Sequence, residues 1–275
     1  MKRLLGVLLA LGLAVTVAAD GTVVCTATPH STGIEFSATP TSAAAGLQCD
    51  LPAAEDEGGG VDPRWDDLVA GWKLDESSDG SAPVARADVL GVYELTDNNT
   101  VPSVAGKIGN AASFTIASSE YFSNASGVMG ADANFTFAGW VWINAAAGAQ
   151  IFFYQHNGNF YLRSNAGNLE LWTRAFADSL IWNGGAAIGT GAWHFVVAWH
   201  DASTNQLGLQ LDDGVVTTGA TGGPNNAGTH TRFGTYELTQ FLGGRLDECY
   251  VFDVVKDAAW RTAMYNGGVG RSYPD

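Results

Sequence analysis

Apolar and polar residues alternate through most of the chain from Trp65 onward, in short stretches separated by Gly, Asn and Asp. A period of two is typical of strands with one buried face, and many short strands divided by turn residues predict an all-β fold of two antiparallel sheets packed as a sandwich. The predicted strands are residues 68–74, 135–143, 150–155, 159–163, 169–173, 193–200, 207–211 and 245–252.

Turn-forming residues stand between several of these stretches: Asn157-Gly158, Ala166-Gly167-Asn168 and Asp213-Gly214. Such residues accept positive φ and favour tight hairpins, so the strands on either side are predicted to be antiparallel neighbours.

A helical pattern occurs only near the end of the sequence, over residues 257–265. Asp257 is a suitable N-cap, Trp260 and Met264 fall on one face at i and i+4, and Gly267-Gly268 follows as a stop signal. We expect one short C-terminal helix.

Composition supports a folded, aromatic-rich chain with a weakly charged surface. Of 275 residues, 46% are hydrophobic and only 15% are charged, and nine are Trp. The formal net charge is −15, and no basic cluster is longer than Lys2-Arg3. This charge disfavours nucleic acids and anionic membrane surfaces as partners.

The first residues have the layout of a secretory signal peptide. Lys2-Arg3 precedes an apolar run over residues 4–17, and small residues up to Ala19 precede Asp20. The run is too short to span a bilayer. We therefore predict cleavage after Ala19, no membrane insertion, and a mature chain that is secreted or associated with a cell surface.

Residues 20–64 form a separate N-terminal segment that ends in an acidic, Gly-rich linker. It contains strand-like stretches at residues 22–28 and 34–38 and only one Phe, so it can bury little core of its own. In an exported chain Cys25 and Cys49 can form a disulfide, whereas Cys249 is predicted to be a buried thiol. The segment is either a spacer or a strand that docks onto another copy of the chain.

Six motifs follow one another along residues 65–270. They are Trp72-Lys73-Leu74-Asp75-Glu76, Gly106 to Ala111 with Phe114, Phe135 to Val141, Trp193-His194-Phe195-Val196, Leu209 to Gly214, and Gly244 to Glu248 followed by the helix. In this order they resemble the laminin G-like branch of the concanavalin A-like lectin and glucanase superfamily. The resemblance implies a jelly roll with ligand sites on rim loops or on the concave face, and we expect Trp72, Trp140 and Trp193 to bind the two sheets together.

Hydrolytic activity is not expected. Glucanases of this superfamily carry Glu-x-Asp-x-x-Glu on one strand face, and the sequence lacks that spacing. The nearest match is Asp247-Glu248, but adjacent strand residues point to opposite faces and so cannot flank one glycosidic bond. No Gly-x-Ser-x-Gly elbow occurs either. We interpret the chain as a protein that is not an enzyme.

Relatives in this superfamily often hold calcium with carboxylates at the rim. The resemblance places the first and last strands side by side, which brings Asp75 near Asp247, and Asp88 is the third predicted ligand. The alternative is that Asp247 and Glu248 bond Arg245 or backbone amides at a strand end without a metal.

A sugar-binding site needs an exposed aromatic ring beside polar groups. Trp182 and Trp172, with Tyr161, Asn183 and Arg174, supply that mixture. Trp182-Asn183-Gly184-Gly185 is predicted to be a turn, while a core or sheet-edge role for Trp172 is the alternative.

Three successive aromatics, Phe152-Phe153-Tyr154, suggest that Phe153 faces outward as a protein contact. The preferred function is an exported binding domain for a carbohydrate or a surface glycoprotein. The alternative is a self-associating surface protein in which residues 20–64 dock onto another copy of the chain.

Overall fold

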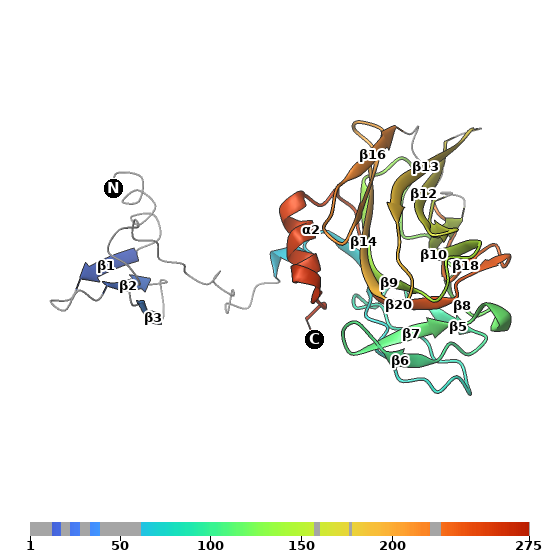
Figure 1. Ribbon diagram of the computed structural model, residues 1–275, viewed down its shortest axis with the longest axis horizontal. Coiled ribbons are helices and arrows are strands. Elements are labelled where there is room, and N and C mark those ends of the chain that lie inside the picture. Colours follow the sequence, from blue (N-terminus) through green and yellow to red (C-terminus); the bar gives the residue numbers. More distant parts are fainter. Residues whose placement is uncertain are drawn as a thin grey trace. The chain divides into compact units, whose positions relative to one another are not determined.

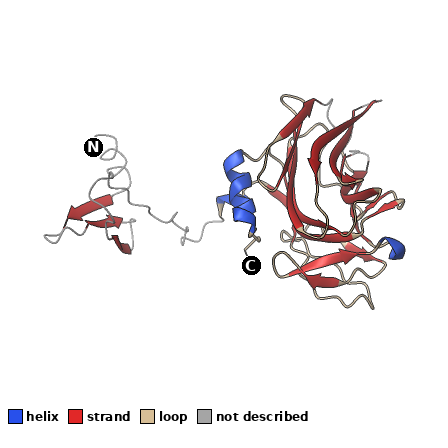
Figure 2. Cartoon of the chain, viewed as in Figure 1, coloured by secondary structure: helices blue, strands red, loops and turns tan. Residues whose placement is uncertain are grey.

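In the computed structural model the described residues are 62–156, 160–175, 178–220 and 227–274. Three strands nearer the start of the chain are also described. The side chains of residues 174–186 are not described. The chain forms two compact units, Met1–Gly60 and Val61–Asp275. Strands dominate the second unit (Figure 2). Among the described residues, none of the helices has the length and apolar character needed to cross a membrane.

The first unit contains one antiparallel sheet of three strands, β1 (Leu13–Val17), β2 (Val23–Ala27) and β3 (Ile34–Ala38), in that order. The strand-like stretches predicted in the N-terminal segment are thus confirmed as β2 and β3. Cys25 pairs with Phe36 across these strands. Cys49 lies outside the described residues, so the Cys25–Cys49 disulfide stays a prediction.

The second unit is a sandwich of two antiparallel sheets, and the predicted fold class is confirmed. The first sheet has seven strands in the order β13 (Asp178–Ala187), β12 (Asn168–Ala175), β11 (Phe160–Asn165), β10 (Ala149–His156), β17 (His230–Phe233), β8 (Tyr121–Asn124) and β5 (Thr96–Asn98).

The second sheet has eight strands, seven of them in the order β16 (Thr217–Ala220), β15 (Gln206–Leu211), β14 (Trp193–Asp201), β9 (Phe135–Ile143), β20 (Gly244–Phe252), β7 (Asn110–Phe114) and β6 (Ser103–Ala105). The eighth, β4 (Leu68–Trp72), pairs with β20.

Strand β20 is the central element of this second sheet. One edge of β20 pairs with β9; the other pairs first with β7 and then with β4. The pairing of β20 with β9 shifts register between Asp247 and Tyr250, where Glu248 has a φ of 49°. This is a β-bulge, so strict alternation of side chains fails at Asp247-Glu248.

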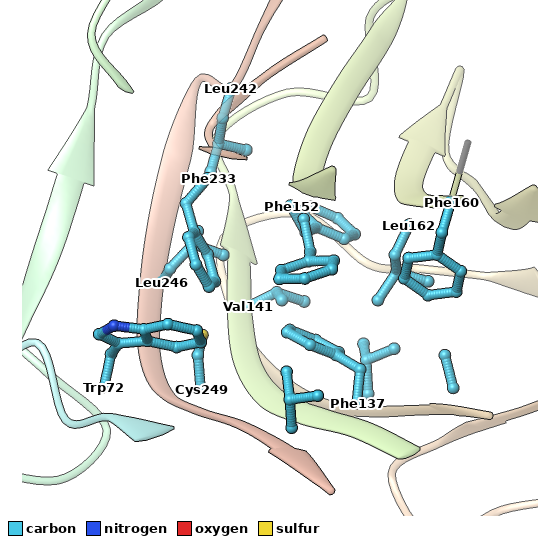
Figure 3. Packing of buried hydrophobic residues seen from close by; sticks show 14 of the residues in the cluster. Trp72, Phe137, Val141, Phe152, Phe160, Leu162, Phe233, Leu242, Leu246 and Cys249 are labelled. Atoms are coloured by element: carbon cyan, nitrogen blue, oxygen red, sulfur yellow. The ribbon is translucent and has the colours of Figure 1, made fainter. Parts of the chain in front are cut away.

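The space between the sheets is filled by aliphatic and aromatic side chains (Figure 3). Trp72 is fully buried there, donates its indole N–H to the Tyr93 carbonyl at 2.7 Å, and packs edge-on against Phe233 at 5.0 Å. Cys249 lies beside Trp72 in this core, and burial raises the pKa of its thiol. The buried thiol predicted from the sequence is therefore confirmed.

The outer face of the eight-stranded sheet is covered by the helix α2 (Ala258–Tyr265), which lies beside β14 on the side away from β10 and β12 (Figure 1). As predicted, Asp257 caps this helix, accepting a hydrogen bond from the Trp260 N–H at 2.7 Å, and Trp260 and Met264 are buried. Short 3-10 turns occupy Pro63–Trp65, Ile116–Ser118 and Asn266–Gly268.

Two of the three tryptophans expected between the sheets lie elsewhere. Trp140 is buried under α2 with Phe195 and Tyr265, and Trp193 is only partly buried on the same outer face. The cause is alternation along β9: Val141 points into the core, so Trp140 must point away from it.

The prediction that Phe153 is exposed is wrong. The register of β10 shifts between Ile151 and Phe153, and Phe152 and Phe153 both reach the core cluster. Tyr154 faces the other side but is buried under the hairpin of β18 (Thr235–Tyr236) and β19 (Gln240–Phe241), where Tyr236 packs on it at 5.0 Å.

Candidate functional site

The outer face of the seven-stranded sheet brings two of the predicted sugar-binding residues together. Tyr161 on β11 is the cross-strand partner of Trp172 on β12, and their rings stack with centroids 4.8 Å apart and planes inclined by 13°. Tyr154 on β10 is paired with Tyr161 in turn. We call Tyr154, Tyr161 and Trp172 the aromatic row.

The other three predicted residues belong to the neighbouring edge of the same sheet. Trp182-Asn183 is not a turn: both residues lie within β13, where Trp182 pairs with Leu171 and Asn183 pairs with Glu170. Arg174 pairs with Ser179. The side chains of these three predicted residues are outside the described part, so their roles stay predictions.

The aromatic row is closed to solvent. Only 7% of Tyr161 and 8% of Trp172 are exposed, and Tyr236 of the β18–β19 hairpin packs edge-on against Tyr161 at 5.4 Å. Burial raises the pKa of Tyr161 to about 12. A sugar could stack on this row only if the hairpin moved.

Ion pairs accompany the aromatic row. Arg163 bonds Glu170 through two nitrogens at 2.7 Å, and its guanidinium carbon lies 5.0 Å from the centroid of the Tyr161 ring. Arg163 and Glu170 are themselves mostly buried, with 12% and 8% of their side chains exposed. Their opposite charges neutralise each other, which stabilises the closed face of the sheet at the aromatic row.

Two partly exposed indoles lie instead on the outer face of the eight-stranded sheet. Trp142 on β9 and Trp193 on β14 are cross-strand partners whose rings meet edge to face at 5.9 Å and 67°. Among the tryptophans whose side chains are described, they are the two that are not buried. We call them the exposed tryptophan pair.

Polar groups surround the exposed tryptophan pair. Arg245 on β20 is the other cross-strand partner of Trp142, and its guanidinium lies 4.8 Å from the Trp142 ring. The Trp142 indole N–H donates to the Asn144 side chain at 3.2 Å. A corner of two aromatic rings with amide and guanidinium donors at its edge is the chemistry that binds a sugar ring.

This surface was available to sequence reasoning but was not recognised there. In the predicted strand over residues 135–143, Phe137, Val141 and Ile143 are the apolar positions that face the core. Trp142 is out of phase with them, so alternation alone directs it outward. The signal for Trp193 is that it opposes Trp142 in the next strand.

The predicted calcium ligands lie at the edge where β4 and β20 pair. Asp247 accepts hydrogen bonds from the backbone N–H groups of Lys107 and Ile108 at 2.6 and 3.0 Å, and Asp75 accepts from that of Asn110 at 2.6 Å. A Cβ at Gly109 would meet a carboxylate oxygen of Asp75 at 2.2 Å. The two carboxylates therefore hold the loop before β7.

The third predicted ligand, Asp88, is used in a similar way. Its two oxygens accept from the backbone N–H groups of Gly71, Val92 and Tyr93 at 2.8 to 2.9 Å. Asp75, Asp88 and Asp247 do not form a cluster of three ligand atoms in the described part of the chain. The calcium site stays a prediction, and the contacts of Asp247 are those of the alternative, a carboxylate bonded to backbone amides.

Burial is the main cause of the pKa shifts of the carboxyl groups at this edge of the sheet. Burial raises the pKa of Asp247 to about 8 against the opposing hydrogen bond from Ile108, and the charges of Glu248 and Asp75 raise it further. Burial also raises the pKa of Glu248 to about 7, against the hydrogen bond from Tyr250. Both carboxyls are almost entirely shielded from solvent. Because of the bulge, the strand alternation assumed from the sequence does not hold for Asp247 and Glu248.

The architecture matches a known family. A laminin G domain model with the description "Concanavalin A-like lectin/glucanases superfamily" matches residues 115–260. Because the match spans more than half of the chain, the chain belongs to the concanavalin A-like lectin/glucanases superfamily, and the resemblance drawn from the sequence motifs is confirmed. No curated protein matches the sequence.

Several solved structures share the fold. Domain 4 of AbnA, an extracellular arabinanase from Geobacillus stearothermophilus solved in complex with arabinotriose, is 16% identical with a TM-score of 0.56, over 74% of this chain and 98% of that domain. The binding domain of Paraclostridial Mosquitocidal Protein 1 is 13% identical with a TM-score of 0.60, and the match covers 74% of this chain and 53% of that domain.

The binding domain of botulinum neurotoxin DC, in complex with SialylT, is 11% identical with a TM-score of 0.57, over 74% of this chain and 52% of that domain. The chain thus spans about half the length of the two toxin binding domains. At these identities the likeness shows the shared fold.

Proposed function

We propose that this protein is an exported, non-catalytic binding domain that recognises carbohydrate, free or on a surface glycoprotein. The observation that carries the proposal is the exposed tryptophan pair with Arg245 beside it. The fold is also that of domains whose structures were solved with arabinotriose and with SialylT.

The physical reason is the match between this corner and a sugar ring. The apolar face of a pyranose or furanose ring packs on one indole of the pair while the other indole lines its edge. Arg245 and Asn144, which is exposed, supply donors and an acceptor for the hydroxyls. The net charge of −15 favours neutral or cationic glycans over polyanions.

The sequence-predicted surface gives the proposal a second location. Trp182 and Asn183 on β13 and Arg174 on β12 would serve if their side chains present an open face. The same function is proposed for either surface, and single substitutions separate them.

The test is retention of the full chain on immobilised neutral polysaccharides, with Trp142→Ala, Trp193→Ala and Trp182→Ala compared with the unmodified chain. Tyr121→Ala is the matched control, because Tyr121 is a partly exposed aromatic residue on β8 of the other sheet. We expect Trp142→Ala and Trp193→Ala each to weaken binding about tenfold, since losing a ring that stacks on a ligand is worth roughly 1.4 kcal/mol.

Three outcomes are distinct. Loss with Trp142→Ala and Trp193→Ala supports the exposed tryptophan pair. If only Trp182→Ala loses retention, carbohydrate binding is supported but the site lies on β13. If the unmodified chain is retained by no polysaccharide and elutes as a large particle that dissociates when residues 20–64 are deleted, the self-associating alternative replaces carbohydrate binding.

A further inference from the structure

Three metal-ligating side chains meet on the solvent side of the seven-stranded sheet, apart from the exposed tryptophan pair. They are His156 at the end of β10, His230 at the start of β17, and Glu237 in the turn between β18 and β19. One ligand atom from each lies within 4.8 Å of the others, and no other group of three His, Cys, Asp or Glu in the described residues does so.

Backbone pairing brings the three together. His156 and His230 are cross-strand partners, and their imidazole rings stack at 4.5 Å with planes 8° apart. Glu237 and Leu238 take positive φ values of 44° and 58° in the hairpin turn, and the hairpin is fixed to the sheet by the packing of Tyr236 on Tyr154.

The contacts within the cluster leave ligand atoms available. His156 Nδ1 lies 2.5 Å from Glu237 Oε1 and 2.7 Å from the Tyr154 hydroxyl, which also donates to Glu237 at 2.5 Å. Arg232 donates to the other carboxylate oxygen, Oε2, at 3.0 Å. His230 Nε2 is buried and has no hydrogen-bond partner within the described part of the chain. A buried polar nitrogen without a partner is costly, so it points to an unrecorded ligand.

The surroundings favour the ligating forms of two of the three residues, His230 and Glu237. Burial, followed by the charge of Arg232, lowers the pKa of His230 and so favours the neutral imidazole. Burial would raise the pKa of Glu237, but the hydrogen bonds from Tyr154 and Arg232 bring it below its usual range. Arg232 is a positive group that opposes a cation, and it bonds Oε2 of Glu237 rather than Oε1.

We propose that His156, His230 and Glu237 bind one divalent transition-metal ion of the zinc class. Two imidazole nitrogens and one carboxylate oxygen are a common three-residue zinc set, whereas calcium takes oxygen ligands. Tetrahedral zinc with bonds near 2.1 Å spaces its ligand atoms about 3.4 Å apart. The ion would therefore lengthen the 2.5 Å contact between His156 and Glu237 and draw His230 Nε2 inward.

The ion would reinforce contacts that already fix the β18–β19 hairpin to the sheet. Glu237 bonds Tyr154 on β10 and Arg232 on β17, and the ion would add a link from Glu237 to His156 and His230 on the same two strands. That hairpin carries Tyr236, which covers Tyr154 and Tyr161. The bound metal would hold the aromatic row closed. This inference is independent of carbohydrate binding at the exposed tryptophan pair.

The test uses the full chain, stripped with a chelator and then titrated with Zn²⁺, with metal content measured after dialysis. His230→Asn and Glu237→Gln remove one ligand each. His194→Asn is the matched control, because His194 also contacts a carboxylate, Asp212 at 2.6 Å, but belongs to no group of three.

We expect one tightly held zinc per chain in the unmodified protein and in His194→Asn, and at least tenfold weaker binding in the other two variants. At a zinc concentration about 100 times Kd, the Tm of the unmodified chain should rise by roughly 5–10 °C, and that of His230→Asn should not.

Cobalt(II) bound to the unmodified chain should show the intense visible absorption of a four-coordinate ion. This spectrum needs no variant, so it tests the site even if His230→Asn fails to fold. The proposal is overturned if the unmodified chain holds no zinc and leaves cobalt in its aqueous form, or if His194→Asn loses as much zinc as Glu237→Gln.

Discussion

Asp247→Asn removes an ionisable group from the junction of β4, β20 and the loop before β7. The amide of asparagine keeps an oxygen that can accept from the backbone N–H groups of Lys107 and Ile108, which are the bonds that Asp247 makes. The substitution therefore changes the charge at this position more than the geometry.

The magnitude follows from the pKa of Asp247, which rises from 3.8 to about 8 on folding because the carboxyl is buried. Between those two values the folded chain holds a proton on Asp247 that the unfolded chain has released. The contribution of Asp247 to stability is therefore present at low pH and is lost as the pH rises toward 8. The free energy of unfolding falls by about 1.4 kcal/mol for each pH unit in that window.

The assay is urea unfolding of the unmodified chain and of Asp247→Asn at several pH values. From about pH 5 to about pH 7, the variant should gain about 3 kcal/mol relative to the unmodified chain. Asp132→Asn is the control, because Asp132 is exposed and its replacement should leave the pH profile parallel to that of the unmodified chain. If the Asp247→Asn profile also runs parallel, Asp247 is not a buried neutral acid and the reasoning is refuted.

Two further substitutions test the packing and the backbone anchoring. Gly208→Ala would place a Cβ 1.9 Å from the Trp199 ring, so it should cost about 1–3 kcal/mol in urea unfolding, whereas Gly130→Ala meets its nearest neighbour at 3.4 Å and should leave the midpoint almost unchanged. Asp88→Ala leaves the Gly71 N–H and two others without an acceptor, which should cost about 3 kcal/mol and speed amide exchange at Gly71. If chelator alone produces the same loss in the unmodified chain, Asp88 acts as a calcium ligand instead.

The sequence predicted best the strands that form an apolar run between turn residues. β15 shows the expected alternation, with Leu207 and Leu209 in the core cluster, whereas β9 and β14 are buried on both faces. β5, by contrast, is Thr-Asp-Asn, a sequence with no strand signal of its own. It is a strand because β8 pairs with it, and a contact between distant segments cannot be found in a local pattern.

The candidate site was likewise only partly predictable from the sequence. The proximity of Tyr161 and Trp172 follows from a predicted hairpin with Ala166 and Gly167 at positive φ in its turn, and that part was predictable. Their burial was not, because the covering Tyr236 comes from a hairpin far along the chain. The bulge at Glu248 has no sequence signal either, since a positive φ there is carried by a residue that rarely adopts it.

The central place of β20 also has a consequence for biosynthesis. The partners of this strand, β4, β7 and β9, all precede it, and β4 is the first strand of the sandwich. At about 5–20 residues per second, a ribosome needs roughly 10–35 s to make the chain between β4 and β20. During that interval the apolar faces of three strands lack their common neighbour, so the nascent sandwich cannot close and stays accessible to chaperones until the last strand emerges.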